Sequence, residues 1–301
     1  MRFLSRTLAS RTLATVAAMA LAAGATALLP DAALAGTGMP SDWQMNLQGP
    51  ATEVSEYIHW FHNWLNVIIF IISVFVLGLL VYVAWRFNEK ANPVPSKTTH
   101  HALLEVAWTV IPVLILVVIA IPSFRLLKLQ LEIPQADLTL KVTGQAAWYW
   151  TYEYPQESGE PITFDSLMLD EKQRAEVIAS GKIAAAEAPR LLAVDNEAFV
   201  PVGKVVRVQV TGAGVIHKFT VPSFGIKIDA IPGRLNETWF KADREGIYYG
   251  QCSFICGQNH SYMPIAVRVV SQERYAAWLA EKKKQAANVG DAAGKVAKAG
   301  E

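Results

Sequence analysis

Two thiols, an imidazole and a thioether lie within twelve residues in the C-terminal part of the chain. They belong to Cys252, Cys256, His260 and Met263, in the pattern C-x3-C-x3-H-x2-M. Thiolate and thioether sulfur combined with imidazole nitrogen favours copper, whereas magnesium and calcium prefer oxygen ligands. The segment therefore predicts a copper site.

A second histidine, His217, lies in a stretch whose alternation predicts a strand. His217, Phe219 and Val221 would share one face of that strand, from which the imidazole could reach the cysteine segment. Two thiolates, two imidazoles and one thioether exceed the ligands of a single blue-copper ion, which takes two His, one Cys and a weak axial Met. Two metal ions bridged by the two thiolates would use all five side chains.

Two other interpretations of the cysteines stay open at this point. A disulfide between Cys252 and Cys256 suits an exported domain, but it leaves His260 and Met263 unexplained. A structural zinc site with two Cys and two His has the right number of ligands, but it leaves the thioether without a role.

The composition excludes several other classes of protein. The 301 residues are 52% hydrophobic and 18% charged, with a net charge of +1, so we expect no nucleic-acid partner. Two cysteines are too few for a disulfide-dense scaffold. The apolar excess falls in three blocks near 15–29, 65–85 and 106–124, which indicates a membrane protein whose partners include lipid.

The first block has the features of a cleaved export signal, which we place at 1–35. Three arginines precede the Ala/Leu-rich stretch 15–29, and Ala33-Leu34-Ala35 follows it. The alternative is a third membrane helix, but the stretch is shorter than the ~20 residues that a span needs. Cleavage would leave a mature chain that begins on the exported side of the membrane.

The second and third blocks predict a transmembrane hairpin within residues 36–134, with spans at about 65–85 and 106–124. The alternative is a helical hairpin buried in a soluble core. Residues 36–63 contain no Lys or Arg, so the positive-inside rule places the connecting loop in the cytoplasm and both ends outside. The basic residues of the loop are Arg86, Lys90 and Lys97.

After Pro134 short alternating stretches predict an antiparallel sandwich or barrel over residues 135–270. An insertion at about 167–189 predicts a helix or irregular loop, and 271–301 predicts a solvated helix and frayed tail. The expected strands are 138–143, 148–154, 204–211, 215–221, 237–242, 247–251 and 265–270.

The chain resembles subunit II of the cytochrome c oxidases of the haem-copper family. The resemblance rests on the run 252–264, on His217, on 225–236, on the Trp148-Tyr149-Trp150 motif and on the hairpin. It implies an all-β, cupredoxin-like Greek-key barrel outside the membrane that carries a binuclear copper A centre. The family accepts electrons from cytochrome c and passes them to haem a of subunit I, which supports oxygen reduction and proton pumping.

The resemblance also assigns roles to individual residues. Cys252 and Cys256 would bridge the two copper ions, His217 and His260 would each bind one, and Met263 would be a weak ligand. The remaining roles are the main-chain carbonyl of Phe254 as a ligand, Trp148 as the aromatic residue that receives the electron, Glu105 at the mouth of a proton channel, and Arg234 at the contact with subunit I.

Three departures from the family pattern bear on these roles. The family usually has Glu at the position of Phe254, where the carboxylate helps to bind magnesium at the subunit I interface, so it stays open whether magnesium binds here. Gly214 and Lys218 remove a negative charge and add a positive one near His217. One residue more than usual precedes Trp148, which leaves the local register undetermined.

Other acids would then have to attract a basic cytochrome c. The candidates are Glu153, Glu157, Asp195 and Asp229.

We therefore expect an electron-accepting oxidase subunit in a bacterial inner membrane, with a periplasmic copper domain. Three rival functions are the alternatives. A quinol-oxidase form of the subunit would lack metal, although all five side-chain ligands are present here. A copper carrier would bind one Cu(I) and has no need of the hairpin. Nitrous oxide reductase needs a large propeller that 301 residues cannot hold.

Overall fold

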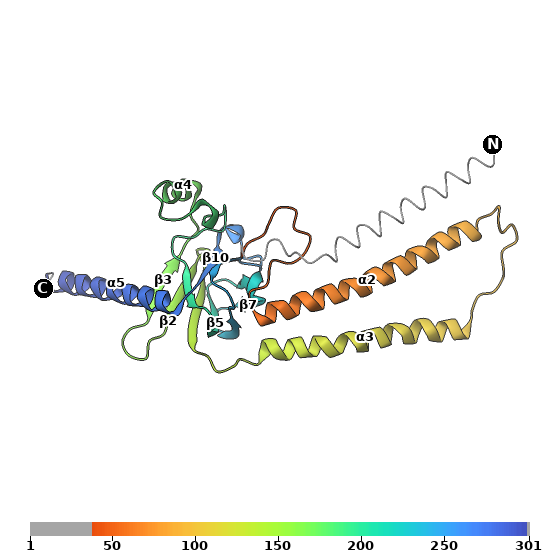
Figure 1. The fold of residues 1–301 in the computed structure, drawn as a ribbon, viewed down its shortest axis with the longest axis horizontal. Coiled ribbons are helices and arrows are strands. Elements are labelled where there is room, and N and C mark those ends of the chain that lie inside the picture. Colours follow the sequence, from red (N-terminus) through yellow and green to blue (C-terminus); the bar gives the residue numbers. More distant parts are fainter. Residues whose placement is uncertain (1–37, 300–301) are drawn as a thin grey trace. The chain divides into compact units, whose positions relative to one another are not determined.

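The computed structural model describes residues 38–299, so the export signal expected at 1–35 lies outside the described residues. The described chain forms two compact units (Figure 1). One comprises residues 58–127 and the other comprises residues 38–57 together with 128–299.

Two long helices contain the expected membrane spans. They are α2 (Glu53–Arg86) and α3 (Ala102–Leu131), and they run in opposite directions (Figure 1). Their most apolar windows have mean hydropathies of 3.1 and 2.6, and no residue of either window is buried by protein. Apolar surface of this extent is what lipid covers, and the alternative of a buried-core hairpin is therefore wrong.

Ten strands form the β-rich part of the second unit, which also holds the helices α4 (Glu171–Ala179) and α5 (Gln272–Ala299). The strands lie in three sheets with the orders β3-β2-β1-β5-β8, β4-β10-β9 and β6-β7. Their bounds are β1 (Leu138–Gln145), β2 (Trp150–Tyr154), β3 (Ile162–Ser166), β4 (Ala198–Pro201), β5 (Val205–Ala213), β6 (His217–Val221), β7 (Ile226–Ala230), β8 (Asn236–Lys241), β9 (Gly246–Gln251) and β10 (Pro264–Val270).

The sheets are mixed, and the expectation of purely antiparallel pairing is wrong for two pairs. β1 pairs with β5 in parallel, with Leu140 opposite Val208, and β10 pairs with β4 in parallel. Parallel neighbours need a long crossover connection, and the segment between β1 and β5 is long enough because it holds β2, β3, β4 and the insertion. The result is consistent with a cupredoxin-like fold.

Alternating burial explains how these strands enclose a core. In β2 and in β6 every second residue is buried, starting from Trp150 and from His217 respectively. The β2 stretch was expected to begin at Trp148, but Trp148 lies in the turn before it. Three short strands, β3, β4 and β7, were not predicted, because they have only four or five residues each and carry polar side chains or a terminal Pro.

The insertion and the C-terminal helix pack onto this core. The insertion contains α4, whose N-cap Asp170 forms a capping box with Gln173. Trp278 of α5 stacks on Phe199, with ring centroids 4.9 Å apart, and meets Tyr154 edge-on at 5.1 Å. The first turns of α5 therefore belong to the folded domain, so the expectation of a simply solvated helix is wrong for them.

Hydrogen bonds attach the ends of both long helices to the β-rich part of the same unit. The Thr52 hydroxyl donates to the Phe224 carbonyl at 2.9 Å. The indole N–H of Trp239 donates to the carbonyl of Leu129, in the last turn of α3, at 3.2 Å. These hydrogen bonds join the residue before α2 and the last turn of α3, both within the second unit, to the β-rich part.

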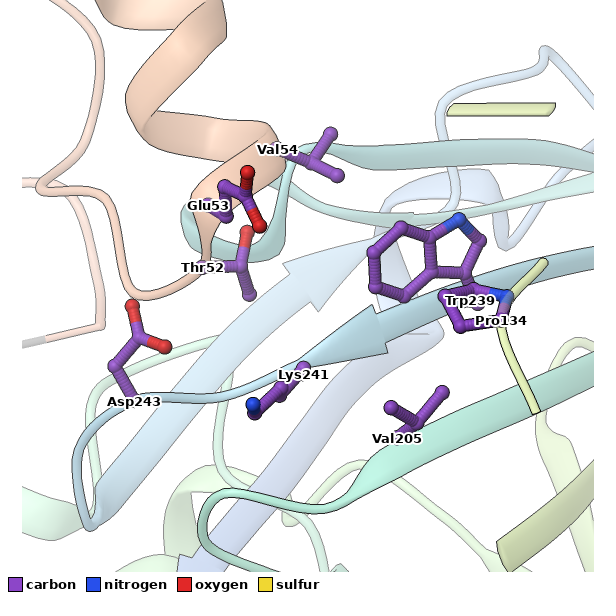
Figure 2. A pocket seen from close by; sticks show the side chains of 8 residues that line it. All are labelled: Thr52, Glu53, Val54, Pro134, Val205, Trp239, Lys241 and Asp243. Carbon is purple, nitrogen blue, oxygen red and sulfur yellow. The ribbon is translucent and has the colours of Figure 1, made fainter. Parts of the chain in front are cut away.

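A pocket of about 300 Å³ lies at this attachment (Figure 2). Figure 2 shows Trp239 and Pro134 together on one side of it and Asp243 on the other, with Lys241 between them. None of its lining residues is one of the predicted metal ligands. The complete lining is Thr52, Glu53, Val54, Pro134, Val205, Trp239, Lys241 and Asp243.

Candidate metal centre

The cysteine segment forms the loop between β9 and β10, which pair antiparallel. β6, which begins at His217, lies beside β9. Two contacts fasten the loop to β6: the Ser253 N–H donates to the Lys218 carbonyl at 3.2 Å, and the hydroxyls of Thr220 and Ser253 are 2.6 Å apart. The packing of β6 against β9, which belong to different sheets, thus brings His217 to the cysteines.

The predicted ligand atoms converge on one small volume. The ligand atoms of His217, Cys252 and Cys256 all lie within 4.8 Å of one another. The two Sγ atoms are 3.8 Å apart, and His217 Nδ1 is 3.9 Å from Cys252 Sγ. His260 Nδ1 is 3.5 Å and Met263 Sδ is 3.9 Å from Cys256 Sγ.

The backbone carbonyl of Phe254 completes this set of donors, since it lies 3.3 Å from Cys252 Sγ. Both cysteines are free thiols. Cys252 and Met263 are buried, with exposed fractions of 5% and 1%, so the sulfur atoms are shielded from water.

The imidazole of His217 is held in one tautomer. Its Nε2 lies 3.0 Å from the carbonyl oxygen of Gln145. Because a carbonyl can only accept, Nε2 carries the proton and Nδ1 presents its lone pair to the cysteines. Burial lowers the pKa of His217 below its usual value, which favours the neutral, ligating form.

The thiol of Cys256 is held in its neutral form in the metal-free protein. Burial, together with the neighbouring thiol of Cys252, raises the pKa of Cys256 to about 12. A thiol with so high a pKa becomes a metal ligand when a cation replaces its proton.

The donor chemistry fits copper. Two thiols, two imidazoles, a thioether and a carbonyl are arranged around one centre. A tetrahedral zinc site would use only four of them and would leave the thioether of Met263, 3.9 Å from Cys256 Sγ, without a purpose. Soft sulfur donors that include a thioether are typical of copper.

The turn before β2 brings Trp148 to the same loop. Its indole N–H donates to the Cys256 carbonyl at 3.1 Å. The Trp148 N–H donates to the Gln145 carbonyl at 3.0 Å, and Trp148 has a φ of +60°. A non-glycine residue in this region is uncommon and costs free energy, so Trp148 lies in a strained turn.

Sequence reasoning missed three residues that support the ligands from the β1–β2 hairpin. Gln145 accepts the His217 hydrogen bond, Gly144 leaves room for the imidazole, and the indole N–H of Trp150 donates to the carbonyl of Met263 at 3.1 Å. Only the Trp148-Tyr149-Trp150 motif could have drawn attention to them. Its second tryptophan received no role.

Comparisons with known proteins agree with this geometry. The model of the cytochrome c oxidase subunit II periplasmic domain matches residues 138–270, and that of the transmembrane domain matches residues 40–126. The chain belongs to the cytochrome c oxidase subunit II family. It is therefore a membrane protein with two spanning helices and a C-terminal soluble domain, and a subunit of an oxidoreductase complex.

Individual relatives show the extent of the similarity. The probable cytochrome c oxidase subunit 2 of Rickettsia bellii is 49% identical over 249 residues, which are 83% of this chain and 88% of that one. The cytochrome c oxidase subunit 2 of Cereibacter sphaeroides is 49% identical over 252 residues, 80% of this chain and 81% of that one. The crystal structure of the periplasmic domain of subunit II of cytochrome oxidase (CoxB) of Bradyrhizobium japonicum is 55% identical, covers 51% of this chain and 99% of its own, and has a TM-score of 0.44.

In this subunit II, two departures from the family pattern contact each other. The ammonium group of Lys218 lies 5.9 Å from the centre of the Phe254 ring. The same group forms an ion pair with Asp229 at 2.9 Å. Lys218 therefore places a cation beside the Phe254 ring, and it neutralises one of the acids expected to attract cytochrome c.

The other acids expected at the docking face differ in their surroundings. Glu153 pairs with Lys141 at 3.1 Å, and Asp195 accepts a hydrogen bond from the Leu167 N–H at 2.8 Å. Glu157 is exposed. Paired charges cancel at a distance, so Asp195 and Glu157 stay the stronger candidates for long-range attraction.

Glu105 is not part of the metal centre. It lies in the first turn of α3, where its carboxylate accepts a hydrogen bond from the His101 N–H at 3.2 Å. Arg234 is exposed in the turn before β8. The roles predicted for them, Glu105 at a proton channel and Arg234 at a contact with subunit I, both involve the partner subunit.

Proposed function

We propose that this subunit holds a binuclear copper A centre, accepts electrons from cytochrome c and passes them to haem a of subunit I, so supporting oxygen reduction and proton pumping. The observation that carries the proposal is the convergence of five side-chain donors and one carbonyl. The sulfur and nitrogen atoms form a chain of contacts of 3.5–3.9 Å through the two thiols.

In this assignment Cys252 and Cys256 would hold the two copper ions together with His217 and His260. His217 lies on the Cys252 side and His260 on the Cys256 side. Met263, near Cys256, and the Phe254 carbonyl, near Cys252, would supply weaker ligands. Copper bound there would supply a one-electron redox couple shared by two ions.

The protein contributes a fixed geometry. His217 is anchored by Gln145 on one strand, and the loop is anchored to β6 through Ser253. Ligands that cannot move when the charge changes keep the reorganisation energy of electron transfer small. Phe254 cannot contribute a carboxylate to magnesium, so the proposal for the copper centre includes no magnesium ion.

Trp148 is proposed to receive the electron from cytochrome c. Its ring is half-buried, and its indole is hydrogen-bonded at 3.1 Å to the backbone of the ligand Cys256. This contact connects the surface to the centre through one side chain and one hydrogen bond.

The proposed cellular arrangement follows from the sequence. Residues 1–35 would be a cleaved export signal, 36–134 the anchor, 135–270 the copper domain and 271–301 the C-terminal tail. The copper domain would lie on the periplasmic side of a bacterial inner membrane, with Glu105 at the mouth of the proton channel on the opposite side. The partners would be subunit I, other oxidase subunits and cytochrome c.

The experiment that tests this function is copper loading of the purified full-length protein, followed by copper analysis and absorbance spectroscopy. Two copper ions per chain and intense thiolate-to-copper bands are expected, and Cys256→Ser should lose them. Ser261→Ala, an exposed change in the same loop, is the matched control. A metal-free protein would indicate the quinol-oxidase form, and one Cu(I) per chain a copper carrier; either result overturns the proposal.

A further inference from the structure

Trp150 contacts two of the ligand residues at once. Its side chain is completely buried at the start of β2. The indole N–H donates to the Met263 carbonyl at 3.1 Å, while the ring meets the His217 imidazole edge-on, with centroids 5.9 Å apart at 62°. In a third contact the ring meets Phe219 of β6 edge-on, with centroids 5.3 Å apart.

The hydrogen bond acts where the ligand loop joins β10. Met263 ends a short 3-10 helix, with φ −127° and ψ 70°, and Pro264 is the first residue of β10. The carbonyl of Met263 is therefore not directed by a helix or by the first ladder pair. Since this carbonyl and the thioether belong to one residue, the indole that holds the carbonyl also limits where Sδ lies.

A weak axial ligand is the one most sensitive to such positioning. The protein sets the distance of a weak thioether to the metal, and the axial ligand tunes the reduction potential of thiolate copper sites. Outer hydrogen-bond partners of ligand residues influence metal centres in the same way. In a buried, low-dielectric environment the hydrogen bond is stronger than at the surface.

Resting on the proposed copper centre, we propose that Trp150 is a positioning residue which, through the Met263 carbonyl and the His217 ring, sets the strength of the Met263 ligand and so the reduction potential of the centre. Trp148 differs from it. The indole N–H of Trp148 donates to the Cys256 carbonyl, and its half-buried ring is partly accessible at the surface.

The test removes only the N–H group. Benzothienylalanine, in which sulfur replaces the indole N–H, is incorporated at position 150 of the full-length protein, and Trp150→Phe is made in parallel. Copper content, the electron paramagnetic resonance spectrum and the midpoint potential are measured. We expect two retained copper ions, an altered hyperfine pattern and a shifted potential.

Two comparisons make the result specific. The same analogue at position 239, whose N–H donates to the Leu129 carbonyl at 3.2 Å, removes a partly buried indole hydrogen bond away from the ligands and should change neither spectrum nor potential. Adding Met263→Leu to the analogue at position 150 should produce a smaller further shift than Met263→Leu alone, because both changes act through one ligand.

An unchanged potential and spectrum at position 150, or full additivity with Met263→Leu, would overturn the role of Trp150 while leaving the copper centre intact. If Trp150→Phe fails to fold, the isosteric analogue decides. A parent protein that lacks the two-copper spectrum would instead overturn the proposed function itself.

Discussion

Gly144 lies directly against the imidazole of His217. A Cβ atom at position 144 would lie 2.7 Å from Cδ2 of that ring and 3.1 Å from its Cβ and Cγ. His217 is completely buried and also held by the Gln145 carbonyl, so the ring has no free space into which to move. His217, a predicted ligand, can therefore occupy its position only because residue 144 has no side chain.

Gly144→Ala should displace His217 from the metal centre. Forcing a methyl group into a packed site costs about 1–3 kcal/mol, and here the strain falls on a ligand. We expect reduced copper retention and a distorted spectrum, measured by copper analysis and electron paramagnetic resonance. Gln145→Ala, which keeps the accepting carbonyl and loses only the side-chain contact to Thr151, should retain the parent spectrum. Equal spectra for the parent and Gly144→Ala would contradict the account.

The candidate ligands could be identified from the sequence because their chemistry is concentrated in one loop. Cys252, Cys256, His260 and Met263 are adjacent in the chain, and His217 lies on a clearly alternating strand. The two spans were equally apparent from their continuous apolar composition. These features depend on side-chain type and local spacing, which the sequence displays directly.

The supporting contacts could not be found in this way, because they join backbone groups to distant side chains. The N–H of Trp150 meets the carbonyl of Met263, 113 positions further on, and the His217 ring meets the carbonyl of Gln145. Any residue type can supply such a carbonyl. The parallel β1–β5 pairing and the packing of Trp278 similarly depend on the tertiary fold.

Met263→Leu should retain both copper ions and shift their potential. Leu is close to Met in volume, and such exchanges cost less than about 1.5 kcal/mol, so the buried site should stay folded. Redox titration of the copper-loaded protein measures the shift. Complete loss of metal would show that the thioether is an essential ligand and not a weak one.

Copper should protect both thiols from alkylation. Without copper, the two thiols should be alkylated at different rates because they differ in accessibility. In the metal-free protein Cys256 is partly exposed, whereas Cys252 is 5% exposed, so iodoacetamide should modify Cys256 first. Burial raises the pKa of Cys256 to about 12, so its thiolate fraction and labelling rate should rise about tenfold per pH unit from pH 7 to 10.

Mass spectrometry of labelled peptides checks both statements, because these are the two cysteines of the chain. Copper-loaded protein should react at neither thiol. A labelling rate that levels off near pH 9, or undiminished labelling after copper loading, would contradict the proposed environment.

Lys218→Ser should speed reduction by a basic cytochrome c at low ionic strength. The change removes a cation beside the metal loop and leaves Asp229 unpaired, so the docking face becomes more negative. Electrostatic steering acts on association rates and is screened by salt, so we expect an increase of about severalfold that disappears at high ionic strength. Stopped-flow reduction measures it.

Lys172→Ser, the same charge change in the exposed first turn of α4, is the control and should have little effect. A rate that falls in Lys218→Ser, or that rises equally in both variants, would show that Lys218 does not oppose docking.

The most direct test of the central claim is the electron paramagnetic resonance spectrum of the copper-loaded, full-length protein. One unpaired electron shared by two equivalent copper nuclei gives a seven-line hyperfine pattern, which is the result that the converging thiols of Cys252 and Cys256 predict. A four-line pattern from a single copper ion, or no copper signal from a protein that holds zinc, would contradict it.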